Sequence, residues 1–282
     1  MPRFERSITA GLLLAAIAAL AACGGERETP PREPAGEAAL RPEPTKDGAA
    51  AAVEHGWNVL LITLDTVRPD ALGAYGQGRG ATPHIDRMAA EGVVFDAAVS
   101  SSPNTLPSHA SIFTGKHPFT HGARSNLGYV LSPEQETLAE RLAAAGYRTA
   151  AEVAAMVMRE ETRIAQGFES VRDPNGADVE LKTVHRPGHD PIEFPIRVAR
   201  DIGRRGSEFI RAHRERPFFL WLHFFDAHEP RRPPEPFATT FRDDPYLAEV
   251  AYQDAQIGKL RETIEQLGLR RRTLVIVTAD HG

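Results

Sequence analysis

The chain has 282 residues, of which 41% are hydrophobic and 25% charged, so it can hold one large domain or two small ones with a substantial core. Its net charge of −5 and the lack of a basic stripe with interleaved aromatic residues argue against a nucleic-acid partner. A single cysteine, Cys23, excludes an internal disulfide and any metal cluster built on cysteine.

The first 23 residues have the pattern of a bacterial lipoprotein signal. Arg3 and Arg6 precede an apolar run, residues 8–22, which is short for a membrane span and suits the core of a signal peptide. The run ends in Leu-Ala-Ala before Cys23, so we predict that the sulfur of Cys23 carries a lipid. The alternative is an ordinary secretory signal followed by a chance cysteine. We therefore expect a protein of the bacterial cell envelope, lipid-anchored to the membrane and facing the periplasm or the cell surface.

Residues 24–56 are rich in Pro, Ala, Glu and Arg and contain almost no large apolar side chains. A segment of this composition cannot bury enough surface to offset the entropy that it loses on ordering, so we predict a flexible tether. Apolar patterning typical of a folded domain begins at Trp57. We assign residues 57–282 to this domain.

Strands and helices are predicted to alternate along the domain. Residues 57–66 form an apolar run that breaks on Asp65, which is typical of a strand buried on both faces of a parallel sheet. The alternation indicates an α/β fold with a mostly parallel sheet. Residues 156–194 resist assignment, and we expect them to form loops that line a substrate pocket. The further expected strands are 93–100, 147–155, 217–226 and 272–280, and the expected helices are 82–92, 132–146, 195–214 and 245–267.

Three of the expected helices have recognisable N-terminal signals. Thr82-Pro83 is a good pair for an N-cap and a first helical residue. Ser132, with Gln135 three residues on, has the spacing of a capping box. A further helix is expected to begin at Thr105, which places a hydroxyl group at its N-terminal end.

Polar side chains follow three of the expected strands. Asp65-Thr66 ends the first strand, Asp226-Ala227-His228 ends a later one, and Asp280-His281-Gly282 ends the last. Taken singly, an aspartate after a strand is more often a turn former or a helix cap than a ligand. In an open α/β sheet, however, ligands bind beyond the carboxyl ends of the strands, where these groups would meet. Together with Thr105, they favour a functional site.

The chemistry of these groups points to a metal-assisted nucleophile. A threonine hydroxyl is weakly nucleophilic at neutral pH and needs a base or a metal to activate it. A divalent cation bound by Asp65, Asp280 and His281 could contact Thr105 and lower the pKa of its hydroxyl. One such ion is expected, and the ligand types suit Ca²⁺, Mn²⁺ or Zn²⁺ without choosing among them.

The expected helix at Thr105 also favours an anionic substrate. Its free N–H groups and the positive end of its dipole would face the same point as the cation. Lys116 could add a positive charge, although a solvated lysine after a helix is equally plausible from its spacing. These features together indicate an ester of a tetrahedral oxyanion, which means a phosphate, a phosphonate or a sulfate.

With these residues in view, the chain resembles the N-terminal catalytic domain of the sulfatase family, within the alkaline phosphatase superfamily. The resemblance rests on residues 58–76, 82–100 and 105–122, and later on the stretches AGYRTA, HFFDAHEP and TLVIVTADHG. It covers nearly everything from residue 58 to the end, in the family's order. It implies a large, mostly parallel mixed sheet sandwiched between helices.

The resemblance also implies roles for individual residues. Thr105 would be the nucleophile and would touch the metal as well. His109, Lys116 and His228 would contact the anion or protonate the leaving oxygen. The implied metal ligands are therefore Asp65, Thr105, Asp280 and His281, and the implied catalytic residues are Thr105, His109, Lys116 and His228.

Several positions depart from the family's usual pattern. Sulfatases that use formylglycine make it from a Cys or Ser, whereas oxidation of Thr105 could only give a ketone, so we expect no formylglycine. His109 stands where an arginine is usual, and Thr66 stands where the family has a second aspartate. The pair Asp280-His281 looks more like the branches that act on phosphonate and phosphate esters.

We expect a metal-dependent hydrolase of sulfate esters, similar to an arylsulfatase, or of related phosphate and phosphonate esters. Its substrate would be a small molecule or a glycan that carries such an ester. The alternatives are a phosphoethanolamine- or phosphoglycerol-type transferase of the envelope and an inactive truncated lipoprotein. Similar chains continue past the Asp-His-Gly motif, so we expect a missing C-terminal part and little activity from residues 1–282 alone.

Overall fold

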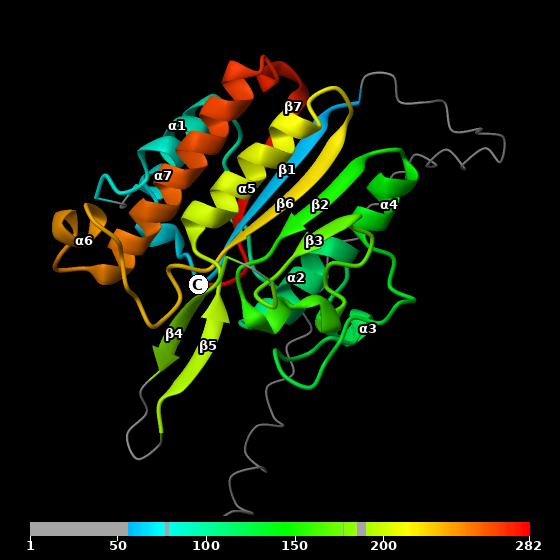
Figure 1. The fold of residues 1–282 in the computed structure, drawn as a ribbon, viewed down its shortest axis with the longest axis horizontal. Coiled ribbons are helices and arrows are strands. Elements are labelled where there is room, and N and C mark those ends of the chain that lie inside the picture. Colours follow the sequence, from blue (N-terminus) through cyan, green and yellow to red (C-terminus); the bar gives the residue numbers. More distant parts are fainter. Residues whose placement is uncertain (1–55, 77–78, 177, 185–189) are drawn as a thin grey trace, which may run out of the picture. The chain divides into compact units, whose positions relative to one another are not determined.

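Five parallel strands form the central sheet of the part that the computed structural model describes, residues 56–282 without 77–78, 177 and 185–189. Their order is β3-β2-β6-β1-β7, and every neighbouring pair is parallel (Figure 1). The mostly parallel α/β fold expected from the sequence is therefore confirmed. The strands are β1 (Asn58–Leu64), β2 (Arg148–Glu152), β3 (Ser170–Arg172), β6 (Phe218–Phe224) and β7 (Thr273–Ala279).

Strand β1 lies between β6 and β7 and is apolar along nearly its whole length, as expected for a central parallel strand. Its alternate residues point to opposite faces, so Leu60 and Ile62 join one apolar cluster and Leu61 joins the other. Leu64 is in register with Phe224 of β6 and with Ala279 of β7. The three strands thus end side by side, and the residues after them share one edge of the sheet.

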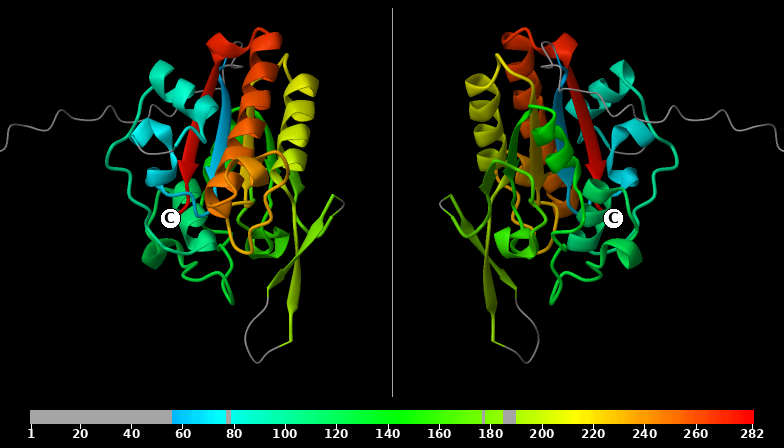
Figure 2. Two further views of the ribbon diagram at one scale, coloured as in Figure 1. Left: turned by 90° about the vertical axis from the view of Figure 1, so that its left-hand side faces the viewer. Right: turned by 90° about the vertical axis from the view of Figure 1, so that its right-hand side faces the viewer.

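Helices cover both faces of the sheet (Figures 1 and 2). The cluster that contains Leu60 includes side chains of α1, α5 and α7, and the cluster that contains Leu61 includes side chains of α2 and α4. The expected sandwich of a sheet between helices is therefore present. The helices are α1 (Pro83–Glu91), α2 (Thr105–Thr114), α3 (Pro118–His121), α4 (Leu138–Ala144), α5 (Ala199–Ala212), α6 (Phe237–Thr240) and α7 (Pro245–Gln266).

A separate antiparallel hairpin, β4 (Glu180–Val184) and β5 (Ile192–Ile196), extends from the carboxyl end of the sheet (Figure 2). The loops predicted throughout residues 156–194 are wrong in part, because both hairpin strands and β3 lie in this stretch. The predicted helix 195–214 also begins later, at Ala199, because its first residues complete β5. Charged and apolar residues alternate too irregularly in this stretch for the pattern to reveal the strands.

Two sequence-based predictions about local structure are wrong. Residues 93–100 do not form a strand, and Val93, Phe95 and Val99 are 80%, 71% and 90% exposed, because no described strand pairs with this segment. The capping box at Ser132 does not form either. Helix α4 begins at Leu138, where Thr137 accepts from the Glu140 amide and the Glu140 side chain accepts from the Thr137 amide. Both sequences fit the capping-box spacing, and only the second directly precedes the apolar helix.

The predicted signal, residues 1–23, and nearly all of the predicted tether, residues 24–56, lie outside the described residues. Neither prediction is therefore tested. In the part of the chain that is described, no helix combines the length and the apolar character that crossing a membrane requires.

Candidate metal centre and active site

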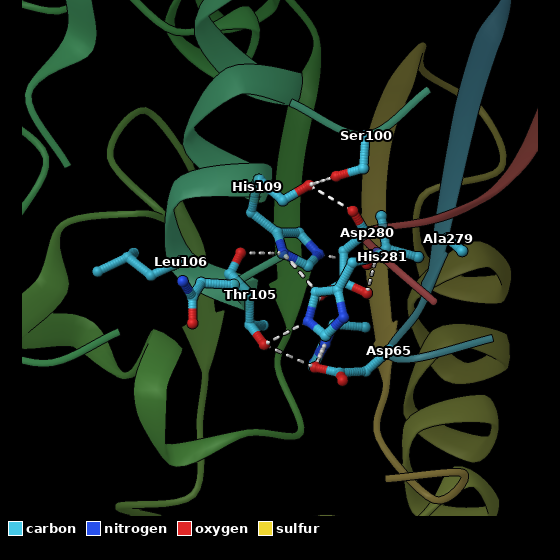
Figure 3. A network of polar contacts seen from close by, with 12 residues as sticks. Asp65, Ser100, Thr105, Leu106, His109, Ala279, Asp280 and His281 are labelled. Atoms are coloured by element: carbon cyan, nitrogen blue, oxygen red, sulfur yellow. Dashed lines mark hydrogen bonds and ion pairs between the residues drawn. The ribbon is translucent and has the colours of Figure 1, made fainter. Parts of the chain in front are cut away.

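The three predicted metal ligands meet at the carboxyl edge of the sheet. Asp65 directly follows β1, and Asp280 and His281 directly follow β7, which is hydrogen-bonded to β1. One ligand atom from each residue lies within 4.8 Å of the others. Thr105 is the first residue of α2, and its side chain enters the same cluster from the opposite side (Figure 3). The topology therefore brings together groups that are separated by up to 216 positions in the sequence.

The Thr105 hydroxyl is central to this cluster. Its Oγ1 donates to Oδ2 of Asp65 at 3.2 Å and lies 3.3 Å from Nε2 of His281 (Figure 3). The same His281 nitrogen is 3.4 Å from Oδ2 of Asp280. An alcohol oxygen, two carboxylates and one imidazole nitrogen thus share a small, largely buried space.

The cluster has the properties of a cation site. Oδ1 of Asp65 and Oδ2 of Asp280 are buried and have no hydrogen-bond partner among the described residues. Unpaired buried carboxylate oxygens are costly unless a proton or a cation compensates them. Oxygen ligands with one imidazole are the set expected for a hard or borderline divalent ion. The residues present therefore fit the metal that the sequence predicts.

The pKa values of the two carboxyl groups reflect the same cost of burying a carboxylate. Burial raises the pKa of Asp65 to about 6, while nearby His228 and His281 and the Thr105 hydrogen bond oppose this rise. Burial also raises the pKa of Asp280, and the nearby charge of Asp65 raises it further. Both carboxyl groups thus resist ionisation until a positive charge stands between them.

The main chain around the site holds Asp280 firmly. Its Oδ1 accepts from the amides of Thr66 at 3.2 Å and His281 at 2.7 Å, and its carbonyl oxygen accepts from Oγ of Ser108 at 2.6 Å. Thr66 adopts a φ of 58°, which is strained for a β-branched residue, and its buried hydroxyl has no partner among the described residues. The strained backbone directs the Thr66 amide to Asp280.

His109 is completely buried, and both of its ring nitrogens are engaged inside the protein. Nδ1 donates to the carbonyl oxygen of Thr105 at 2.8 Å, and Nε2 lies 3.0 Å from the hydroxyl of Thr63. That hydroxyl accepts from the indole N–H of Trp221 at 2.9 Å, so it can donate its own proton to Nε2 of His109. Burial lowers the pKa of His109 to about 4, which keeps the ring neutral near pH 7.

The structure does not bring Lys116 to this cluster. Lys116 is exposed beyond the last turn of α2, and its Nζ donates to Oε1 of Gln135 at 2.8 Å. Helix α2 has 10 residues and rises about 15 Å, so Lys116 and Thr105 lie at opposite ends of it.

His228 lies closer to the metal ligands. It is partly exposed in the loop after β6, stacks on Phe225 at a ring distance of 4.4 Å, and donates from Nδ1 to the Glu229 carbonyl at 2.6 Å. Its positive charge, when present, is the strongest influence opposing the rise in the Asp65 pKa. Nε2 of His228 has no hydrogen bond to the described residues.

Two further residues near the site were not predicted as functional. His223 is buried in β6 and carries its Nε2 3.4 Å from Oδ2 of Asp65, while its Nδ1 accepts from the Ala154 amide. A histidine as the penultimate residue of an otherwise apolar strand was the available signal. Lys182 of β4 is also buried and lies near the loop that holds His228. It falls in the stretch that the sequence left unassigned.

Comparison with known proteins adds an independent observation. The family model described as Sulfatase matches residues 57–282. The N-acetylgalactosamine-6-sulfatase of Canis lupus familiaris is 28% identical over 275 residues, which cover 83% of this chain and 52% of that protein. The N-acetylgalactosamine-6-O-sulfatase of Bacteroides thetaiotaomicron is 26% identical, covering 80% and 58%. The arylsulfatase of Clostridium perfringens is 23% identical, and the match covers 80% of this chain and 63% of that protein. The chain spans about half the length of the first two relatives.

Solved structures with the same fold agree with this family match. A protein of the alkaline phosphatase superfamily from Vibrio parahaemolyticus superposes with a TM-score of 0.63 at 18% identity, covering 80% of this chain and 54% of that one. A protein solved in complex with its substrate, D-glucosamine-2-N,6-O-disulfate, gives a TM-score of 0.64 at 18% identity, covering 80% and 65%. At these identities the likeness shows a shared fold.

Proposed function

This chain belongs to the sulfatase family, and we propose that it is a metal-dependent hydrolase of sulfate esters, or of related phosphate and phosphonate esters, with Thr105 as the nucleophile. The observation that carries this proposal is the position of the Thr105 hydroxyl, 3.2 Å from Asp65 and 3.3 Å from His281, at the first residue of a helix. An ester oxyanion at that point would be attracted by the positive end of the α2 dipole.

Asp65, Asp280 and His281 would hold the cation, with the Thr105 hydroxyl beside it. When bound, a divalent ion supplies the positive charge that lowers the pKa of a neighbouring hydroxyl and offsets the charge of the ester oxygens. The ligand set supports Ca²⁺, Mn²⁺ or Zn²⁺.

In the proposed reaction, Oγ1 of Thr105 attacks the sulfur or phosphorus atom while its proton passes to Oδ2 of Asp65, to which it already donates. The bond from that atom to the alcohol oxygen breaks, and Nε2 of His228 gives the leaving oxygen a proton. A water molecule then attacks the same sulfur or phosphorus atom and gives a proton to Nε2 of His228. The bond to Thr105 breaks, Oγ1 takes back its proton from Asp65, and the inorganic anion is released. His109 acts by holding the first turn of α2, since both of its nitrogens are engaged. Lys116 stays outside this scheme.

We further propose that the protein works without formylglycine, because Thr105 cannot be oxidised to an aldehyde. The names of its relatives, N-acetylgalactosamine-6-sulfatase and arylsulfatase, support a sulfated glycan or a small sulfate ester as substrate. The Thr105 nucleophile and the Asp280-His281 pair keep phosphate and phosphonate esters among the candidates. A lipid on Cys23 would place this activity at the bacterial cell envelope.

The test is a panel of 4-nitrophenyl sulfate, phosphate monoester, phosphate diester and phosphonate, assayed with each of the three cations and the full-length protein. We expect turnover of at least one ester and a loss of roughly 1,000-fold or more in Thr105→Ala. Thr114→Ala, in the last turn of the same helix, is the matched control and should retain wild-type turnover. Equal turnover by the wild type and Thr105→Ala would show that another group attacks.

A further inference from the structure

A buried lysine, Lys182, links the β4–β5 hairpin to the loop after β6. Lys182 lies in the middle of β4, in register with Phe194 of β5, and its side chain is only 5% exposed. Its Nζ donates to the carbonyl oxygen of His228 at 2.9 Å and to that of Asp226 at 3.2 Å. One ammonium group thus connects two points of the loop that carries the proposed proton donor.

The same ammonium group also lies beside the aromatic ring on which His228 rests. Nζ of Lys182 is 5.5 Å from the centre of the Phe225 ring, within the range of a cation–π contact. The rings of Phe225 and His228 stack at 4.4 Å with an angle of 19° between their planes. Lys182 therefore contacts three residues of this loop: Phe225, Asp226 and His228 itself.

Lys182 makes no ion pair with a described carboxylate, although acidic groups surround it. Burial lowers the pKa of Lys182, the nearby Asp226, Glu249 and Asp65 oppose that fall, and Arg231 adds to it. Oδ1 of Asp226 accepts from the Ala199 amide, and Oε1 of Glu249 accepts from the Arg232 amide. Burying an ammonium group costs free energy. Because the hydrogen bonds of Lys182 go to main-chain carbonyl groups, we infer that it fixes the conformation of the loop.

We propose that Lys182 is a positioning residue that holds His228 where its Nε2 can protonate the leaving oxygen, so that the β4–β5 hairpin is part of the catalytic apparatus. This inference rests on the proposed function, and in particular on the role of His228. Lys182 itself touches neither the ester nor the metal in this scheme. Its removal should harm the reaction only as far as the reaction needs the proton of His228.

Two esters with different leaving groups test this dependence. The 4-nitrophenolate anion leaves without a proton, whereas an alkyl or sugar alkoxide needs one. In Lys182→Met we expect kcat to fall about tenfold or more for the alkyl or sugar ester and by less than about threefold for the 4-nitrophenyl ester. In a His228→Ala background, the Lys182→Met change should cause no further loss. Equal losses on both esters, or additive losses with His228→Ala, would overturn the proposal.

Amide hydrogen exchange supplies a readout that does not need turnover. The His228 amide donates to the Phe225 carbonyl at 3.1 Å, so its exchange rate reports how well the loop is held. We expect about tenfold faster exchange at His228 in Lys182→Met and no change in Lys259→Met, which alters an exposed lysine of α7. Unchanged exchange in Lys182→Met would refute the positioning role. A wild type that hydrolyses neither ester would instead refute the proposed function, and the exchange result would still decide whether Lys182 holds the loop. If Lys182→Met does not fold, Lys182→Gln takes its place in both measurements.

Discussion

The two ends of α2 belong to one sequence motif, yet they lie in opposite surroundings. Thr105 and His109, in the first turns, are buried against the metal ligands and the centre of the sheet. Lys116, just past the last turn, is exposed and bonded to a surface glutamine. The charge of Lys116 is therefore screened by solvent, whereas each polar atom at the buried end needs a partner.

This difference separates the candidate site from the exposed end of the helix. At the buried end, a hydroxyl, two carboxylates and two imidazoles are held within hydrogen-bonding or ion-pairing distance of one another. At the exposed end, Gly115 adopts a left-handed conformation with a φ of 66°, and this glycine ends the helix. The contrast predicts that substitutions at the two ends will differ greatly in their effect on the free energy of unfolding.

The largest expected effect on stability comes from His109→Leu. The substitution keeps a similar volume but leaves the Thr105 carbonyl and the Thr63 hydroxyl without their buried partner. We expect the free energy of unfolding to fall by about 3 kcal/mol, as measured by urea denaturation. A loss below about 1 kcal/mol would mean that the buried end does not depend on this network.

An intermediate effect is expected from pH in the absence of a cation. Since burial raises the pKa of Asp65 from 3.8 to about 6, the folded state holds this proton more tightly than the unfolded state does. The resulting stabilisation is complete below about pH 4 and is lost as the pH rises through about 6. The full loss is about 3 kcal/mol, of which about 2 kcal/mol falls between pH 4.5 and 7.5. Urea denaturation with a chelator, from pH 4.5 to 7.5, should show this decline in the wild type and less of it in Asp65→Asn. The same slope in both proteins would contradict the assignment.

The smallest effect is expected at the other end of the helix. Lys116→Met removes an exposed charge and one hydrogen bond to Gln135. We expect the free energy of unfolding to change by no more than about 0.5 kcal/mol and the cation affinity to stay the same. A large loss of cation affinity would show that Lys116 reaches the site in solution, and the contrast between the two ends would then fail.

Much of the site could be predicted because strand ends are visible in a sequence. Asp65 and Asp280 each follow an apolar run, and parallel strands that end in register deliver such residues to one edge. Thr105 could be placed because a helix was expected to begin there. Lys182 could not, since only the pairing of β4 with β5, two strands invisible in the pattern, buries it.

The surroundings of Lys116 and His109 could not be read from their closeness to Thr105 in the sequence. Lys116 follows Thr105 closely in the chain, but the full length of α2 separates the two residues. His109 is on the correct side of that helix, yet its burial and its bonds to Thr63 and Thr105 turn it inward. The burial and the hydrogen bonds of these two side chains depend on how the helix packs, and a sequence motif alone does not predict them.

The central claim is that Asp65, Asp280 and His281 form a cation site beside the Thr105 hydroxyl. Isothermal titration of the chelator-treated protein with Mn²⁺, Ca²⁺ and Zn²⁺ tests it most directly. We predict one equivalent bound by the wild type and by Asp243→Asn, which alters an exposed aspartate, and an affinity at least about 100-fold weaker in Asp65→Asn and Asp280→Asn. A wild type that binds none of these ions, or mutants that bind as tightly as the wild type, would contradict the account.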